Sequence, residues 1–313
     1  MKRKSGLSLV ELLVVIAILG VLMSLVLAAV QNARESARRV TCQSNLRQIG
    51  IAAHAFEVSN RSFPSNGWGY RWVADPTRGN GPNQPGGWIY QLTNHLEVLL
   101  PERNGSDAFA HATWRTEISV VPIGVFRCPS RPGPLKSLAS QTASPVNANF
   151  QTLVPKTDYA ANEGDFITNT NEGPQSIAEA ERPNFPWTPT TKATGVIFLR
   201  SKIRTQDIND GLSNTYFGGE KNVSTKGYFD ASDLGHDQSL FSGVDLDLNR
   251  WTIETPKRDA AEQKNRVFGS AHAAITGMLF CDASVHWVSN SIEPSVHRSI
   301  GNRRDGHSAH LGD

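Results

Sequence analysis

One carboxylate stands in a long apolar segment near the N-terminus. Glu11 is the only charged residue between Leu7 and Val30, a segment rich in Leu, Val, Ile and Ala. An ionised side chain inside a membrane span costs roughly 2.5 to 3.5 kcal/mol even on lenient insertion scales, so it is usually retained for a partner or a function. We therefore expect this segment to do more than anchor the protein.

The segment is long enough to cross a bilayer. As a helix, residues 7–30 would extend ~36 Å, against a hydrocarbon core of ~30 Å. A cleaved secretory peptide has a shorter apolar core, so that class fits poorly. An uncleaved signal anchor in which Glu11 is incidental stays an alternative. Basic residues flank both ends, at 2–4 and at 34–39, so the charge distribution alone leaves the orientation open.

The residues from Lys4 to Glu11, KSGLSLVE, resemble the processing signal of type IV prepilins and type II secretion pseudopilins. That family has a short basic leader, a glycine, an apolar residue and a glutamate four residues further on. The resemblance implies that a prepilin peptidase cuts the Gly6–Leu7 bond and methylates the new N-terminus at Leu7. It also implies that Glu11 of one subunit compensates the terminal amine of its neighbour, because two charges that are costly alone in lipid are tolerated together.

The helical pattern continues beyond the apolar segment. Cys42, Leu46, Ile49, Ala53 and Phe56 follow one another at spacings of four, three, four and three, which is one face of an amphipathic helix. One helix over residues 7–58 would reach ~78 Å, well beyond the bilayer. Its apolar face must then be covered, most simply by a globular domain of the same chain. Two shorter helices with a break in residues 30–39 remain an alternative.

Beyond residue 58 the composition is that of an exported globular domain with many loops, because Gly, Pro and Asn cluster in several stretches. We expect a basic leader at 1–6, a transmembrane helix at 7–30, an amphipathic continuation at 31–58, a head at 59–300 and a polar tail at 301–313. Candidate strands come late, at 195–200, 215–220, 277–281 and 285–288, followed by a short helix at 292–300. This order favours an α+β, pilin-like fold with an antiparallel sheet.

A second resemblance covers nearly the whole chain. It rests on RRVTCQSNLRQIG at 38–50, CPS at 128–130, DGLSNT at 210–215 with Glu220, and His272 followed after nine residues by Asp282. These pieces resemble a bacterial pilin-like family of unknown function with a C-terminal H-x(9)-D-G signature. The resemblance assigns structural roles to Asp210, Gly211, Asn214, Glu220, His272 and Asp282. Ala283 stands where the family prefers Gly, which argues against a left-handed turn there.

Three cysteines leave one unpaired if a disulfide forms. Cys42 lies on the apolar helical face, and Cys128 precedes Pro129 where a strand or loop ends. We predict a Cys42–Cys128 bridge between helix and head, with Cys281 free, and such a bridge typically contributes ~2 to 4 kcal/mol. Three buried thiols are the alternative.

His272 and Asp282 invite a catalytic or metal-binding interpretation. They would lie ~30 Å apart on an extended strand, so a hydrogen-bonded structural His and a turn-forming Asp are favoured. The sequence holds no H-E-x-x-H, C-x-x-C or G-x-S-x-G motif. We therefore expect no enzymatic activity, no cofactor and no metal. An acidic region is weighed for calcium but lacks the pattern of an EF-hand: Asp230, Asp233, Asp237, Asp245 and Asp247.

Charge argues against nucleic acid as a partner. Removing Lys2, Arg3 and Lys4 from 31 basic residues leaves 28, against 29 acidic residues, so the processed chain has no basic excess. Expected partners are the prepilin peptidase, other pilin or pseudopilin subunits and inner-membrane lipid.

The sequence thus predicts a structural subunit of a type IV pilus or type II secretion pseudopilus. It would be a single-pass inner-membrane protein with a cytoplasmic N-terminus and an extracytoplasmic head. One alternative is a signal-anchored binding module whose aromatic residues grip a glycan or a protein; the candidates are Trp68, Tyr70, Trp72 and Trp88. A weaker alternative is a membrane-tethered hydrolase that uses His272.

Overall fold

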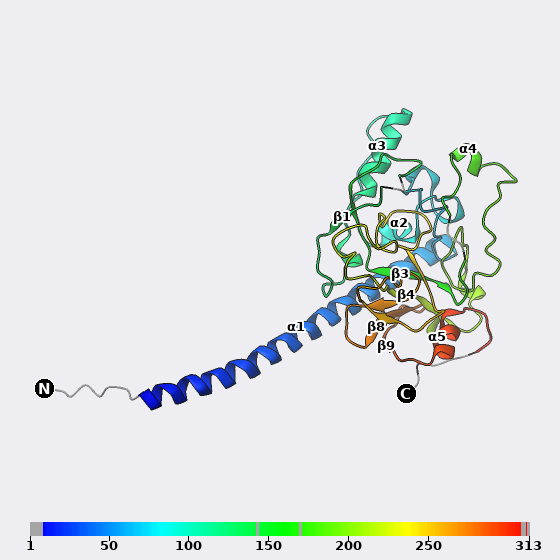
Figure 1. The fold of residues 1–313 in the computed structure, drawn as a ribbon. Helices are drawn as coiled ribbons and strands as arrows, with labels where there is room; N and C mark the ends of the chain where they lie inside the picture. Colours follow the sequence, from blue (N-terminus) through cyan, green and yellow to red (C-terminus); the bar gives the residue numbers. More distant parts are fainter. Residues whose placement is uncertain (1–8, 142–143, 169–170, 308–310, 312–313) are drawn as a thin grey trace.

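A computed structural model describes residues 9–141, 144–168, 171–307 and 311. Helix α1 (Leu9–Asn60) is one continuous helix that projects far out of a globular head, as Figure 1 shows. The break considered for residues 30–39 is absent, and the helix ends two residues later than residue 58. The first half of α1 is long and apolar enough to cross a membrane, with a mean hydropathy of 3.1 over 18 residues.

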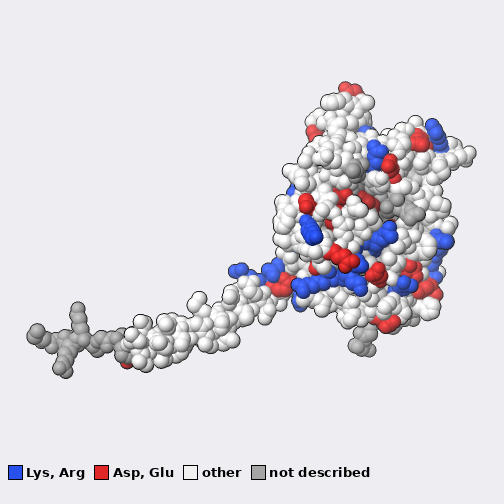
Figure 2. All heavy atoms as spheres, in the orientation of Figure 1, with Lys and Arg blue, Asp and Glu red and all other residues white. Residues whose placement is uncertain are grey.

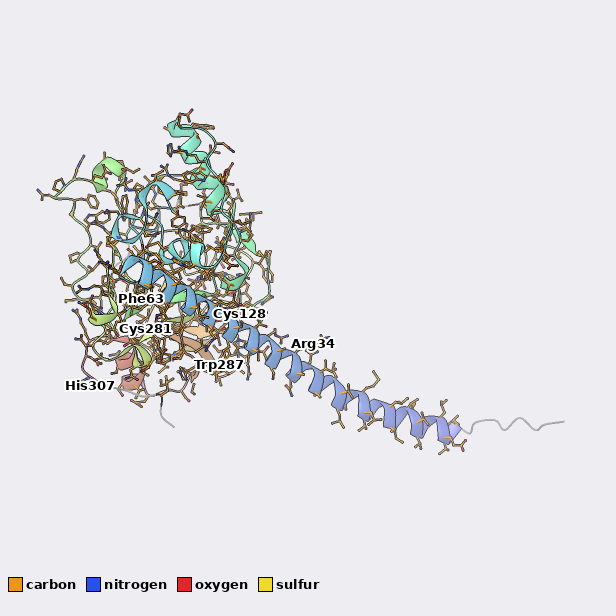
Figure 3. The ribbon with its side chains drawn as sticks, turned by 180° about the vertical axis from the view of Figure 1, so that it is seen from behind. Arg34, Phe63, Cys128, Cys281, Trp287 and His307 are labelled. Carbon is orange, nitrogen blue, oxygen red and sulfur yellow. The ribbon has the colours of Figure 1, made fainter. Side chains whose placement is uncertain are left out.

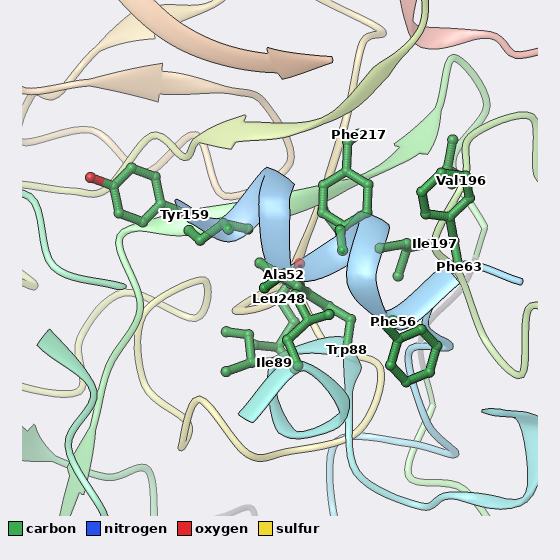
Figure 4. Close-up of a cluster of buried hydrophobic side chains, with 14 of the residues drawn as sticks. Ala52, Phe56, Phe63, Trp88, Ile89, Tyr159, Val196, Ile197, Phe217 and Leu248 are labelled. Carbon is green, nitrogen blue, oxygen red and sulfur yellow. Dashed lines mark hydrogen bonds between the residues drawn. The ribbon is translucent and has the colours of Figure 1, made fainter. Parts of the chain in front are cut away.

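The second half of α1 is buried on one side. Its buried residues recur every three or four positions, as the sequence pattern indicates, and they are Cys42, Asn45, Leu46, Ile49, Gly50, Ala52, Ala53 and Phe56. Toward its C-terminal end α1 runs through the head between the central sheet and α2 (Trp88–Leu92), which Figure 4 shows at close range. The helix is thus the centre of the core and not a strut on its surface.

The central sheet has five strands in the order β5-β3-β4-β8-β9. Their bounds are Asn249–Trp251 for β5, Tyr159–Gly164 for β3, Tyr216–Glu220 for β4, Ile275–Phe280 for β8 and Val285–Ser289 for β9. All neighbouring pairs are antiparallel except β3 and β5, which run parallel. The fold is α+β as predicted, but the sheet is mixed and not wholly antiparallel.

The remaining elements are short and surround this centre. Two small sheets pair β1 (Lys136–Leu138) with β2 (Leu153–Pro155), and β6 (Lys257–Arg258) with β7 (Gly269–Ser270). The other α-helices are α3 (Ala108–Ser119), α4 (Ile177–Ala180) and α5 (Pro294–Gly301). Single 3-10 turns occur at Pro76–Arg78, Gly81–Asn83, Thr93–His95, Gly124–Phe126 (η4), Thr205–Asp207 and Leu212–Asn214 (η6).

Two local predictions are wrong. Residues 195–200 form no strand; Gly195 and Val196 instead donate backbone hydrogen bonds to Glu163 and Asn162 as an irregular segment beside β3. Burial of this segment follows from its apolar side chains, and loop packing meets that need as well as a sheet does. The polar tail also does not leave the head at residue 301, because the buried Arg303 donates to the carbonyls of Ala193 and Gly195.

Ala283 is a third correction. It has φ 65°, in the left-handed region, although it carries a Cβ where the resembling family has Gly. Its N–H donates to the carbonyl of Phe280, and Ser284 donates to the Asp282 side chain, so the tight turn between β8 and β9 holds this conformation. The hairpin geometry outweighs the intrinsic cost of ~1 to 2 kcal/mol for an L residue there.

Gly50 lies where α1 packs tightly against the β8–β9 hairpin. A Cβ at this position would lie 2.8 Å from both the Leu279 side chain and the Ala283 Cβ, too near for either. Only a residue without a side chain lets the helix rest on the β8–β9 hairpin at this distance.

We predict that Gly50→Ala lowers the free energy of unfolding of the head by ~1 to 3 kcal/mol, because the added methyl group overpacks the contact with the hairpin. Thermal unfolding of the full chain in detergent measures the change. Gly20→Ala is the matched control, since a Cβ at Gly20 meets nothing within 4 Å, and it should leave the transition in place. Equal unfolding temperatures for the two variants would contradict the packing argument.

Candidate functional site at the helix–head junction

Side chains from four separate parts of the chain meet where α1 enters the head. We call them the junction cluster: Glu35, Cys42, Cys128, Glu220 and His272. Glu35 and Cys42 lie on α1, Cys128 follows η4, Glu220 ends β4 and His272 precedes β8. Figure 3 labels Cys128 at this entry point, with Arg34 on the bare helix just outside it. The cluster therefore joins the helix to both the sheet and a loop.

The two cysteines of the cluster touch. Cys42 Sγ and Cys128 Sγ lie 2.7 Å apart, both are buried, and both are free thiols in this structure, as is Cys281. A hydrogen bond with Cys42 and burial raise the pKa of the Cys128 thiol, which keeps it protonated. The structure places the predicted partners side by side, and the disulfide between them stays a prediction.

His272 connects two carboxylates. Its Nδ1 donates to Glu35 Oε1 at 2.6 Å, its Nε2 lies 3.4 Å from Glu220 Oε1, and Trp287 packs edge-on against the ring. Burial lowers the pKa of His272, but hydrogen bonds to Cys128 and to the two carboxylates outweigh it and raise the pKa to about 10. The ring is therefore an imidazolium at neutral pH when nothing else occupies the cluster.

Glu35 links the buried cluster to the surface. Its carboxylate also forms an ion pair with Arg38, whose Nη2 lies 2.6 Å away, and accepts a hydrogen bond from the Ser130 hydroxyl at 3.2 Å. Burial raises the pKa of Glu35, but hydrogen bonds from His272 and Arg38 outweigh it and lower the pKa below its usual value. Figure 2 shows basic side chains gathered where the helix meets the head, next to a helix surface without charge.

A buried ion network holds the loop that carries Cys128. Asp158 Oδ2 accepts the backbone N–H of Cys128 at 2.7 Å, and Oδ1 lies 3.3 Å from Arg127 and 3.2 Å from Arg131. Arg131 also pairs with Asp259 at 2.8 Å. Because Asp158 and Arg131 are almost fully buried, each charge depends on its partners for solvation.

The two halves of the C-terminal signature do not meet. His272 is fully buried in the junction cluster, whereas Asp282 is exposed in the β8–β9 turn, where its Oδ1 accepts the N–H of Ser284 at 2.8 Å. The structure therefore gives them separate positions, one at the helix and one in the hairpin.

The Asp210 segment contacts the C-terminal part of the chain. Asp210 accepts the backbone N–H groups of Asp305 and Gly306, both at 2.9 Å, and so fixes the C-terminal segment. Gly211 has φ 93°, a conformation that favours glycine, and Asn214 donates back to the Asp210 carbonyl. These contacts form the turn η6 that leads into β4.

The acidic region separates into two parts. Asp237, Asp245 and Asp247 bring carboxylate oxygens within 4.8 Å of one another, whereas Asp233 caps backbone N–H groups of its own loop. Lys221 Nζ lies 3.9 Å from Asp247 Oδ1. Burial lowers the pKa of Lys221 to about 7, and burial with the neighbouring Asp247 raises that of Asp237 to about 8. A lysine amine thus lies near Asp247, one of the three clustered carboxylates.

Of the N-terminal site residues, the structure describes only Glu11. Glu11 lies on the exposed, apolar half of α1. Gly6 and Leu7 lie outside the described residues.

The sequence does not predict that Glu35 and Glu220 both contact His272. A signal existed for Glu35, which stands seven residues before Cys42 and so on the same face of α1. Nothing in the spacing of Glu220 could reveal its contact with residue 272, because that contact depends on the pairing of β4 with β8.

Two family models match separate parts of the chain. A family described as "Protein of unknown function (DUF1559)" matches residues 31–295, and one described as "Prokaryotic N-terminal methylation motif" matches residues 1–27. No solved structure matches the chain.

Three curated relatives are named "Type II secretion system core protein G". The protein from Klebsiella pneumoniae is 34% identical over 115 residues, which are 34% of this chain and 81% of the relative. That from Aeromonas hydrophila is 32% identical over 112 residues, 33% and 78% of the two chains. That from Pseudomonas aeruginosa is 29% identical over 87 residues, 28% of this chain and 60% of the relative.

We predict that Asp158→Asn destabilises the protein by ~3 to 5 kcal/mol, because it removes the buried negative charge that Arg127 and Arg131 share and leaves Arg131 with Asp259 alone. Chemical unfolding of the full chain in detergent measures this loss. Asp207→Asn is the control, since Asp207 forms an exposed pair with Arg204 at 2.9 Å whose loss should cost ~1 kcal/mol or less. A loss at Asp158 as small as that at Asp207 would refute the role of the buried network.

Proposed function

We propose that this chain, which belongs to the DUF1559 family and carries a prepilin-type methylation motif, is a prepilin-like subunit of a type II secretion pseudopilus or a type IV pilus. The observation that carries the proposal is the division of α1. One half is apolar and exposed, and the other half is the centre of the head. A subunit that packs its neighbours' helices together needs this arrangement. Similarity to core protein G favours the pseudopilus.

Processing by prepilin peptidase would prepare the helix for assembly. The cut between Gly6 and Leu7 removes the basic leader and leaves a terminal amine only a few residues before Glu11. In a filament, Glu11 of one subunit would face the amine of the next, so that each charge provides the counter-ion of the other in an apolar environment.

Helix length and the prepilin-type motif support a position in the inner membrane. Residues 9–30 form ~33 Å of helix, which matches a hydrocarbon core of ~30 Å. The leader would lie on the cytoplasmic side of the inner membrane and the head on the other side. Arg34, Arg38 and Arg39 would then stand at headgroup level, where anionic lipid attracts them.

The competing functions gain no support from the site. Trp68, Trp72 and Trp88 are buried, and their indole N–H groups donate to backbone carbonyls inside the head, so they offer no stacking surface to a glycan. His272 is also fully buried, which keeps a substrate away from the residue on which the hydrolase hypothesis depends.

The first test is the N-terminus of the mature protein. In cells with prepilin peptidase, mass spectrometry of the membrane-extracted chain should find methylated Leu7 as the first residue. Gly6→Leu should keep Met1, because the peptidase no longer accepts the site, and Gly20→Ala should be processed normally. Recovery of Met1 on the unaltered chain in the presence of the peptidase would refute the proposal.

The second test separates assembly from anchoring. Glu11→Val should still insert in the membrane but should lose crosslinked oligomers, because the neighbouring amine then has no counter-ion. Glu11→Asp keeps the charge and should retain part of the crosslinking. Membrane crosslinking followed by electrophoresis measures both variants. Oligomers of Glu11→Val at the level of the unaltered chain would show that the acid serves no assembly contact.

A further inference from the structure

We propose that the junction cluster holds a structural zinc ion through four ligands: Cys42, Cys128, Glu220 and His272. Each residue offers one ligand atom, and these four atoms lie within 4.8 Å of one another. All four side chains are at most 2% exposed. The sequence alone predicts no metal site. The four ligands are spread over more than two hundred residues, and only the fold brings them together.

Two of the distances between ligand atoms are close to the edges of a tetrahedral coordination shell. Cys128 Sγ lies 3.8 Å from His272 Nε2, and that nitrogen lies 3.4 Å from Glu220 Oε1. Tetrahedral zinc with Zn–S of ~2.3 Å and Zn–N or Zn–O of ~2.0 to 2.2 Å has such edges at ~3.4 to 3.6 Å. The edge between the sulfurs is 2.7 Å in the structure and must open by about 1 Å, which a small rotation of one cysteine side chain provides.

The outer contacts of the ligands resemble those of metal sites. A histidine that ligates a metal usually donates its other ring N–H to a carboxylate, and His272 Nδ1 donates to Glu35 at 2.6 Å. Ligating carboxylates are in turn hydrogen-bonded, and Glu220 Oε2 accepts the N–H of Gly277 at 2.8 Å. Thus His272 Nε2 and Glu220 Oε1, which lie 3.4 Å apart, are the atoms left to bind an ion.

The donor set fits zinc better than calcium or magnesium. Two thiolates are poor ligands for calcium and magnesium, whereas sulfur with imidazole and carboxylate suits tetrahedral zinc. Four protein ligands fill the coordination shell, so the ion would have a structural and not a catalytic role. It would tie α1 to the Cys128 loop, to β4 and to the segment before β8.

Binding needs no redox step. The thiol protons of Cys42 and Cys128 and the Nε2 proton of His272 pass to solvent, the Nδ1 proton stays with the imidazole facing Glu35, and zinc remains Zn²⁺. Oxidation of the two thiols to a disulfide would instead remove both sulfur ligands. The zinc site and the disulfide predicted from the sequence therefore exclude each other in one molecule, and one experiment separates them.

The test uses the full chain purified in detergent after growth with zinc. Elemental analysis should find about one zinc per chain. Cys42→Ala and Glu220→Gln should each remove it, whereas Cys281→Ala is the matched control, a buried cysteine outside the cluster that should keep it. Glu35→Gln should weaken zinc affinity by ~10-fold or more, measured by competition with a chelator, because the imidazole loses its carboxylate partner.

A second measurement needs no variant. Replacement of the ion by Co²⁺ in the unaltered chain should give the visible absorption of a tetrahedral site together with a thiolate-to-cobalt charge-transfer band. Peptide mapping without reductant should find Cys42 and Cys128 as separate thiols. A disulfide between them, an octahedral cobalt spectrum, or zinc that persists in Cys42→Ala would overturn the proposal.

Discussion

A single helix must satisfy two different environments, and the rest of the structure depends on this constraint. Along residues 9–34 every side chain of α1 is exposed, whereas from Cys42 onward one face is buried in the head. Burial of a large apolar side chain contributes roughly 1.5 to 3 kcal/mol, and Leu46, Ile49 and Phe56 each contribute at that level. The head folds around this half of the helix, so the membrane segment and the core form one mechanical unit.

The junction between the two environments is where charge gathers. Glu35 and His272 meet where the helix enters the head, and Asp158, which pairs with Arg131, accepts the backbone N–H of Cys128 in the same cluster. Buried charges are costly unless each has a partner, so this region is sensitive to the loss of any one group. Glu35, Asp158 and the N–H of Gly277 hydrogen-bond to His272, the Cys128 backbone and Glu220, and these contacts help to hold the two thiols, the imidazole and the carboxylate together.

Local patterns in the sequence predicted the helix, β4 and the β8–β9 hairpin, because each depends on periodicity or turn residues within a short stretch. They did not predict the parallel pairing of β3 with β5, which joins strands about ninety residues apart. Residues 196–199 are apolar and residues 195–200 form no strand, because burial alone does not distinguish a strand from a packed loop. At the candidate site, the contact of Cys42 with Cys128 was anticipated, but its neighbours Glu220 and His272 were not.

The continuity of α1 also fixes a direction. Between Gly20 and Gly50 the helix contains neither glycine nor proline, so nothing in that stretch offers an easy kink or swivel. The direction in which Glu11 points from the helix axis is therefore fixed relative to the surfaces of the head. One residue inserted near Gln31 would rotate the head by ~100° and raise it by ~1.5 Å relative to that carboxylate. The number of residues in this stretch thus sets the angle around the helix axis between Glu11 and any given surface of the head.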